Sequence, residues 1–142
     1  MSSSVQSAWK IIPMFHSLNI SHTVDFYTQR LGFEIGEVKP DPSDEKSETS
    51  EPYFCSLFIG KKADANLYFS LNREEFKPTQ ALIALGTVEL DEYYKYLKCR
   101  GDVEITDELE DTDWGWRWFT IKDDDGNSLT FFKFLEGGNP GE

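Results

Sequence analysis

The feature that most constrains the fold of this 142-residue chain is an internal repeat. Residues 10–71 predict a strand, a helix and three more strands, and residues 80–135 predict the same series again. The positions that coincide when one half is slid onto the other are Ile12 with Leu82, Ser56 with Trp118, and Tyr68 with Thr130. Because a repeat limits the topology more strongly than any short motif, we expect one α+β domain over residues 1–142, built from two βαβββ modules.

The expected elements follow from hydrophobic periodicity and from the residues that begin and end helices. Strands are expected at residues 10–18, 33–38, 53–59, 66–71, 80–88 and 103–105, before a closing hairpin at 116–132. Helices are expected at residues 23–30 and 90–100, and each is followed by a glycine. The polar stretches at 39–52 and 106–113 lack this periodicity, so we expect both to be loops.

The closing hairpin has two different faces. Phe119 and Ile121 alternate with Trp116 and Trp118, which is the period-two pattern of a strand. The sequence Asp-Asp-Gly-Asn at 124–127 supplies residues typical of a tight turn. One face of the hairpin is therefore apolar, and the other carries indoles and hydroxyl groups.

Acidic residues outnumber basic ones by 26 to 14, which gives a formal charge of −12. This balance argues against nucleic acid and membrane surfaces as partners, because both require a basic footprint. It suits a cationic ligand, and it equally suits simple solubility. Cys55 and Cys99 have neither metal-site spacing nor a disulfide framework, so we expect both to be reduced core residues. With no apolar leader and no membrane-spanning stretch, a cytoplasmic protein is expected.

Two motifs link the halves to a known family. The first half contains Phe26-Tyr27 followed by Leu31-Gly32-Phe33, and the second contains Trp114-Gly115, Arg117, Phe119, Asp123 and Asp125-Gly126-Asn127. With these residues the chain resembles the vicinal oxygen chelate superfamily, which includes glyoxalases, bleomycin-resistance proteins and extradiol dioxygenases. The resemblance implies a curved mixed sheet whose concave face holds a small-molecule ligand, and it implies a homodimer.

The resemblance also bears on metal binding. Metal-using members of the superfamily carry their ligands on the concave face, and the matching positions here are Ile12, Leu82 and Thr130, with a fourth near Tyr68 or Ser70. None of these residues is His, Asp or Glu, whereas a divalent ion needs several such ligands. We therefore expect no metal and no other cofactor, as in the bleomycin-resistance-type branch, which the chain resembles most.

Strand alternation assigns side chains to the concave face, because the neighbours of buried apolar residues point the other way. The expected ligand-binding residues are Met14, His16, Phe54, Ser56, Phe58, Tyr68, Ser70, Trp114, Trp116, Trp118, Thr130 and Phe132. Such an aromatic surface binds flat or cationic molecules, with about 0.5–2 kcal/mol per good contact. Trp114 lies just before the strand, and the sequence equally permits a place for it in a dimer interface.

Two functions remain open from the sequence. The first is a non-catalytic protein that sequesters a bulky aromatic or cationic natural product or drug and so confers antibiotic resistance. The second is a metal-independent isomerase, lyase or cyclase in which His16, Tyr68 or Glu104 moves protons. A metal-dependent glyoxalase or dioxygenase is a weaker alternative, because the metal ligands are missing and His16 and His22 are the only histidines.

Overall fold

The computed structural model describes residues 4–41, 50–61 and 65–137. These residues form two four-stranded mixed sheets, one from each module. The first sheet has the spatial order β1 (Met14–Ser17), β4 (Ala65–Leu71), β3 (Phe54–Ile59), β2 (Glu34–Lys39). The second has the order β5 (Gln80–Ala84), β8 (Ser128–Phe134), β7 (Trp116–Lys122), β6 (Glu104–Asp111). The expected α+β fold with a repeated module is confirmed.

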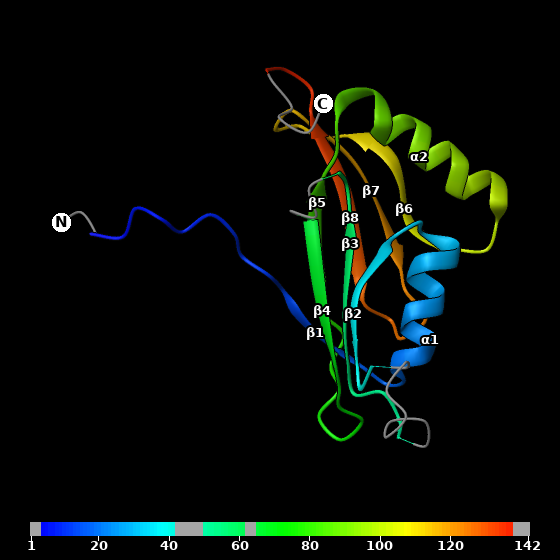
Figure 1. The fold of residues 1–142 in the computed structure, drawn as a ribbon. Helices are drawn as coiled ribbons and strands as arrows, with labels where there is room; N and C mark the ends of the chain where they lie inside the picture. Colours follow the sequence, from blue (N-terminus) through cyan, green and yellow to red (C-terminus); the bar gives the residue numbers. More distant parts are fainter. Residues whose placement is uncertain (1–3, 42–49, 62–64, 138–142) are drawn as a thin grey trace.

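The helices lie on one side of both sheets (Figure 1). α1 (Ile20–Asp25) continues directly into a π-helical turn, η1 (Phe26–Arg30), and α2 (Thr87–Arg100) crosses the second module. α1 begins at Ile20 because the Asn19 side chain caps it by accepting a hydrogen bond from the His22 N–H at 3.0 Å. No helix among the described residues is long and apolar enough to cross a membrane.

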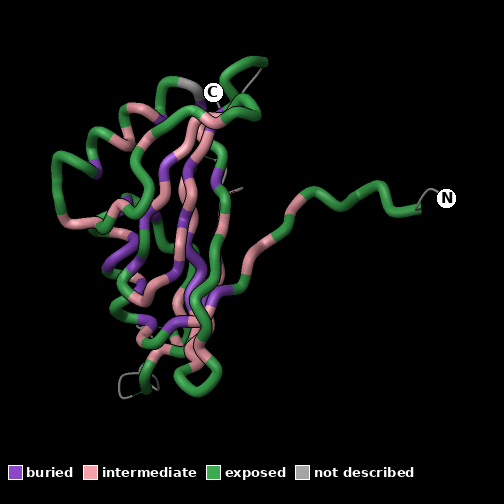
Figure 2. The backbone as a smooth tube through the Cα atoms, turned by 180° about the vertical axis from the view of Figure 1, so that it is seen from behind, coloured by how far each residue is buried: buried purple, intermediate pink, exposed green. Residues whose placement is uncertain are grey.

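The core lies between the helices and the strands, and it is shared by the two modules. Alternate residues of the central strands are buried, as the colours along them show (Figure 2). Phe119 and Phe131 of the second module are fully buried, and so are Phe69 and Leu57 of the first. The buried apolar side chains of both modules form one continuous cluster, so neither module has a separate core.

A buried polar contact joins the modules. The Tyr27 hydroxyl, from the helical segment of the first module, donates to Asp123 Oδ2 in the β7–β8 turn at 2.8 Å. Asp123 also accepts from Asn127 Nδ2 and from the backbone N–H groups of Asp125 and Asn127, each at 2.9 Å. Because every donor faces the same carboxylate, the turn is held in one conformation against the first module.

The stretch expected as an acidic loop is a strand instead. Residues 106–111 belong to β6, which pairs antiparallel with β7 and places Ile105 opposite Ile121. Its pairing shifts register twice, and these irregularities hide the alternation from a reading of the sequence. β6 is the outer edge of its sheet, where charged side chains remain in water and oppose edge-to-edge association.

The structure also corrects the alignment of the two modules. β1 pairs Met14 with Tyr68, and β5 pairs Leu82 with Thr130, so Met14 rather than Ile12 corresponds to Leu82. By the same logic, Ser56 corresponds to Thr120 rather than Trp118. Each shift is two residues, which keeps every side chain on the expected face.

Two further expectations were wrong. Cys99 is exposed, because it lies on the outward face of α2 between Lys98 and Arg100. β1 covers Met14–Ser17 instead of residues 10–18, and the chain before Pro13 extends away from the body (Figure 1). Of the expected loop at 39–52, residues 42–49 lie outside the described residues.

Candidate functional site

The side of the sheets opposite the helices is referred to below as the open face. On the first sheet it carries Met14 and His16 of β1, Tyr68 and Ser70 of β4, and Phe54, Ser56 and Phe58 of β3. The strand pairing places Met14, Tyr68 and Ser56 side by side in one row, and His16, Ser70 and Phe54 in the next. The predicted ligand-binding residues of the first module therefore lie together.

The first-sheet half of the open face combines aromatic rings with two serine hydroxyl groups. Ser56 is buried, and its hydroxyl donates to Asn66 Oδ1 at 3.3 Å. Gly36, on the neighbouring edge strand, leaves room for this side chain, since a Cβ there would lie 2.9 Å from Ser56 Oγ. The Phe54 and Tyr68 rings pack edge to face with centroids 5.1 Å apart.

The second-sheet half of the open face is strongly aromatic. Trp116 stacks on Phe132 with ring centroids 4.4 Å apart and an interplanar angle of 16°. Trp114 meets Trp118 edge to face at 5.2 Å, and Trp116 lies 6.1 Å from Trp118. Together with Phe134, whose ring is 5.8 Å from Trp116, these residues are called the aromatic cluster.

The structure adds detail for two members of the aromatic cluster. Trp114 packs with the other indoles and is 60% exposed, so it forms the outermost part of the cluster. Phe134 was missed by the sequence reasoning, although its place two residues after Phe132 on the same strand is a sufficient signal.

Carboxylates border the open face on the edge strand of the second sheet. Glu110 pairs with Trp118, and Asp107 pairs with Thr120, so both side chains point to the same side as the indoles. Glu104 pairs with Lys122 farther along the strand. Sequence reasoning missed Glu110 and Asp107 as site residues because it assigned this stretch to a loop.

The edge strand of the first sheet is similar. Glu37 pairs with Ser56, and Glu34 pairs with Phe58, which places both carboxylates on the open face. Lys39 pairs with Phe54, and its Nζ lies 5.5 Å from the centre of that ring. Acidic side chains therefore border the open face along both outer strands.

The three candidates for proton transfer are not brought together as one set. His16 and Tyr68 lie on adjacent strands of the first sheet in neighbouring rows. Glu104 lies on the outermost strand of the second sheet. Cys55 points into the core, and burial raises the pKa of its thiol to about 12, so it is not a nucleophile at neutral pH.

Comparison with known proteins identifies the family. The family model described as the glyoxalase/bleomycin resistance protein/dioxygenase superfamily matches residues 19–131, which is most of the chain. The chain belongs to this superfamily. No curated protein matches the sequence.

Solved structures agree with this assignment. A glyoxalase/bleomycin resistance protein/dioxygenase superfamily member from Sphaerobacter thermophilus DSM 20745 is 27% identical, with a TM-score of 0.63 over 89% of this chain and 97% of that one. A glyoxalase-related enzyme from Clostridium phytofermentans is 19% identical, with a TM-score of 0.70 over 93% and 99%. TioX from Micromonospora sp. ML1 is 15% identical, with a TM-score of 0.67 over 91% and 98%. At under 25% identity, the last two show similarity of fold alone.

The superfamily includes proteins with and without metal, so the side chains at the positions that match the metal ligands of other members indicate whether this chain could bind a metal. With the corrected alignment, the inner positions of the two sheets are Met14 and Tyr68 in one module and Leu82 and Thr130 in the other. None of these side chains is an imidazole or a carboxylate. Within the part of the chain that the structure describes, no three His, Cys, Asp or Glu residues come together in a way that suits a metal ion.

Proposed function

We propose that this superfamily member binds a cationic aromatic small molecule on its open face and sequesters it without chemical change, in the manner of the bleomycin-resistance-type branch. The observation that carries the proposal is the aromatic cluster with Glu110 beside Trp118. Indole faces attract cations, and a carboxylate at the rim adds a favourable charge. An anionic or strongly polar ligand does not match this combination.

The two halves of the open face suggest how the ligand lies. Flat rings fit against Trp114, which is the most exposed member of the cluster, and against the half-buried Trp118 beside it. The hydroxyl groups of Ser70 and Thr130 offer hydrogen bonds to polar parts of the same molecule. We infer a bulky ligand, of the size of a natural product or drug, because these features are spread over both sheets.

We further propose that a second copy of the chain completes the binding groove. The first strand of each module, β1 or β5, is an edge strand of its sheet. Both strands expose apolar side chains, with Met14 52% and Leu82 55% exposed. The extended segment before β1 adds Ile11, which is 91% exposed. Apolar surface of this kind on an edge strand is characteristic of an interface.

An exposed free thiol at Cys99 suits a reducing compartment such as the cytoplasm.

Isothermal titration with matched ligands tests the binding function. N-methylquinolinium supplies a flat cation, quinoline supplies the neutral ring of nearly the same shape, and bleomycin supplies a bulky cation. We expect Trp118→Ala to weaken binding of the cations by about 1–3 kcal/mol. Glu110→Gln should weaken only the cations, and Tyr96→Ala, which removes an exposed aromatic residue on the helix side, should change nothing.

Three results would contradict the proposal. Equal affinity of quinoline and N-methylquinolinium would exclude a cation site, and unchanged affinity in Trp118→Ala would exclude the aromatic cluster. Recovery of a chemically altered ligand would replace sequestration with catalysis, and His16→Ala would then be the next variant. The dimer is tested separately by light scattering, in which Leu82→Glu should reduce the mass towards the 16.4 kDa of one chain.

A further inference from the structure

A cavity of about 190 Å³ lies on the helix side of the molecule, away from the open face. It is bounded by one side of the first helical segment and by the β7–β8 turn. The lining residues are His22, Asp25, Phe26, Gln29, Arg30 and Asp124. The cavity is open to solvent on one side, and its size suits a small ligand.

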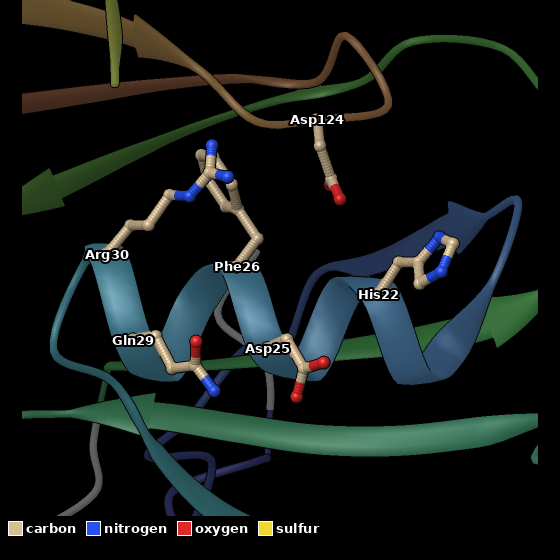
Figure 3. Close-up of a pocket in the computed structure, with 6 residues that line it drawn as sticks. All are labelled: His22, Asp25, Phe26, Gln29, Arg30 and Asp124. Carbon is tan, nitrogen blue, oxygen red and sulfur yellow. The ribbon is translucent and has the colours of Figure 1, made fainter. Parts of the chain in front are cut away.

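The charged groups of the cavity come from two separate elements. Figure 3 shows the Asp124 side chain pointing from the turn towards the helix, with Phe26 and Arg30 directed towards the same space. The Arg30 guanidinium lies 5.3 Å from the centre of the Phe26 ring, and its Nη1 donates to the carbonyl oxygen of Asp102 at 3.1 Å. The cavity thus places a carboxylate and a guanidinium around an aromatic surface.

The Asp124 carboxylate is in an unfavourable position for a negative charge. Partial burial, together with the charges of Asp125 and Asp123, raises its pKa to about 6, and nearby His22 offsets this only in part. A positively charged group in the cavity would stabilise the ionised form. The same turn is fixed from behind by the hydrogen bond between Asp123 and Tyr27, so Asp124 is held on a rigid support.

The helix that forms the opposite wall is irregular at this point. Phe26, Gln29 and Arg30 all belong to the π-helical turn Phe26–Arg30, which follows α1 directly. Such turns are rare and occur frequently at functional sites. The irregular backbone and the cavity therefore coincide.

We propose that this cavity binds a small zwitterion of the α-amino acid class, with its ammonium group at Asp124, its carboxylate at Arg30 and its apolar group over Phe26. The lining offers the carboxylates of Asp124 and Asp25 to a positive group and the guanidinium of Arg30, which is well suited to a carboxylate, to a negative one. This site lies apart from the aromatic cluster, so the proposal does not depend on the function of the open face.

Three related compounds separate a zwitterion site from simpler attraction. L-valine carries both charges, L-valinamide carries only the positive one, and N-acetyl-L-valine carries only the negative one. Each is titrated into the ¹⁵N-labelled full chain at neutral pH while backbone amide shifts are followed. We expect L-valine to shift the amides of Gln29 and Asp124 saturably, with the other two compounds at least about tenfold weaker.

Variants then assign the two charges. Asp124→Asn and Arg30→Gln should each weaken L-valine binding by at least about tenfold, whereas the exposed Glu92→Gln on α2 should leave it unchanged. Equal binding of L-valinamide and L-valine would show that the cavity attracts only the positive charge, and it would overturn the proposal. Absence of saturable shifts, or shifts confined to residues of the open face, would overturn it as well. The comparison of the three compounds uses the unmodified chain, so it stands even if a variant fails to fold.

Discussion

Replacing Tyr27 by phenylalanine tests whether the contact between modules stabilises the fold. The hydroxyl is fully buried and donates to the Asp123 carboxylate at 2.8 Å. A hydrogen bond to a charged group contributes about 1.5–3 kcal/mol, and the lower part of this range applies because Asp123 keeps three other donors. We expect Tyr27→Phe to lower the free energy of unfolding by about 1.5–2 kcal/mol. At about 3 °C per kcal/mol for a chain of this size, the melting temperature should fall by about 5 °C.

The loss should also depend on pH. Burial raises the pKa of Asp123, and the hydrogen bonds from Asn127 and Tyr27 oppose that rise. Removal of the Tyr27 hydroxyl therefore raises the pKa of Asp123 further and penalises its ionised form. The deficit of the variant is largest at high pH, and it decreases as the pH falls through the raised pKa of Asp123.

Urea unfolding of both proteins at pH 8 and at pH 4.5, at one protein concentration, measures this effect. Tyr93→Phe is a matched control, because its hydroxyl donates to the neutral carbonyl oxygen of Leu31 at 2.6 Å. That control should lose about 1 kcal/mol at both pH values. A loss below about 0.5 kcal/mol in Tyr27→Phe, or the same loss at both pH values, would refute the assigned role of the contact.

Three further predictions follow from other contacts. Asp124→Asn should raise the free energy of unfolding at pH 7.5 by about 1 kcal/mol, a figure already reduced for solvent screening. Folding raises the pKa of Asp124 from 3.8 to about 6, so the ionised carboxylate destabilises the folded state at pH 7.5. At pH 4 the substitution should have little effect, and urea unfolding at both pH values tests this difference. Gly36→Ala should destabilise the folded protein by about 1 kcal/mol, because the added Cβ would lie 2.9 Å from Ser56 Oγ. In a protein that also carries Ser56→Ala, this loss of stability should nearly disappear. Equal losses with and without Ser56→Ala, measured by thermal unfolding, would show that this contact is irrelevant. Arg117→Met should lose about 1 kcal/mol at low salt and less at high salt, because Arg117 bridges carboxylates on α2 and β6; a loss independent of salt would point to packing instead of charge.

Much of the fold could be predicted from the sequence because the repeat is expressed in patterns that both modules share. Alternation in β7 and β8 indicated which side of each strand is buried, and the buried Phe119 and Phe131 agree with that prediction. A two-residue error in aligning the modules had no effect on faces, because the side-chain period in a strand is also two.

The strand at 104–111 was harder to predict from the sequence, because its pairing with β7 stabilises it more than its own residues do. Ile105 and Leu109 are its only apolar residues, and two register shifts separate them from a simple alternation. Local propensity favours a loop for so many acidic residues, whereas pairing with β7 holds them in a strand. The border of the candidate site was therefore missed, since Glu110 and Asp107 depend on that pairing.

Spatial relations between distant segments were also beyond the sequence. The cavity at Asp124 combines residues of the first helix with a turn about a hundred positions later, and no short motif records that approach. In contrast, the contacts among the indoles follow from residues close together in sequence, and strand parity was sufficient to place Trp116 and Trp118 on one face.

The single core shared by both repeats has a consequence for how the chain can be recombined. A repeat suggests interchangeable parts, yet the Tyr27 hydroxyl needs the carboxylate of Asp123, and Tyr93 needs the carbonyl of Leu31. A chimera that takes one half from a relative would keep the Tyr27–Asp123 pair only if the relative supplied the matching side chain, whereas the backbone carbonyl that accepts from Tyr93 is present whichever residue stands at position 31. Exchange of modules between superfamily members should therefore succeed only when the residues on both sides of the contact between the modules are exchanged together. The two modules thus have to be replaced as a pair.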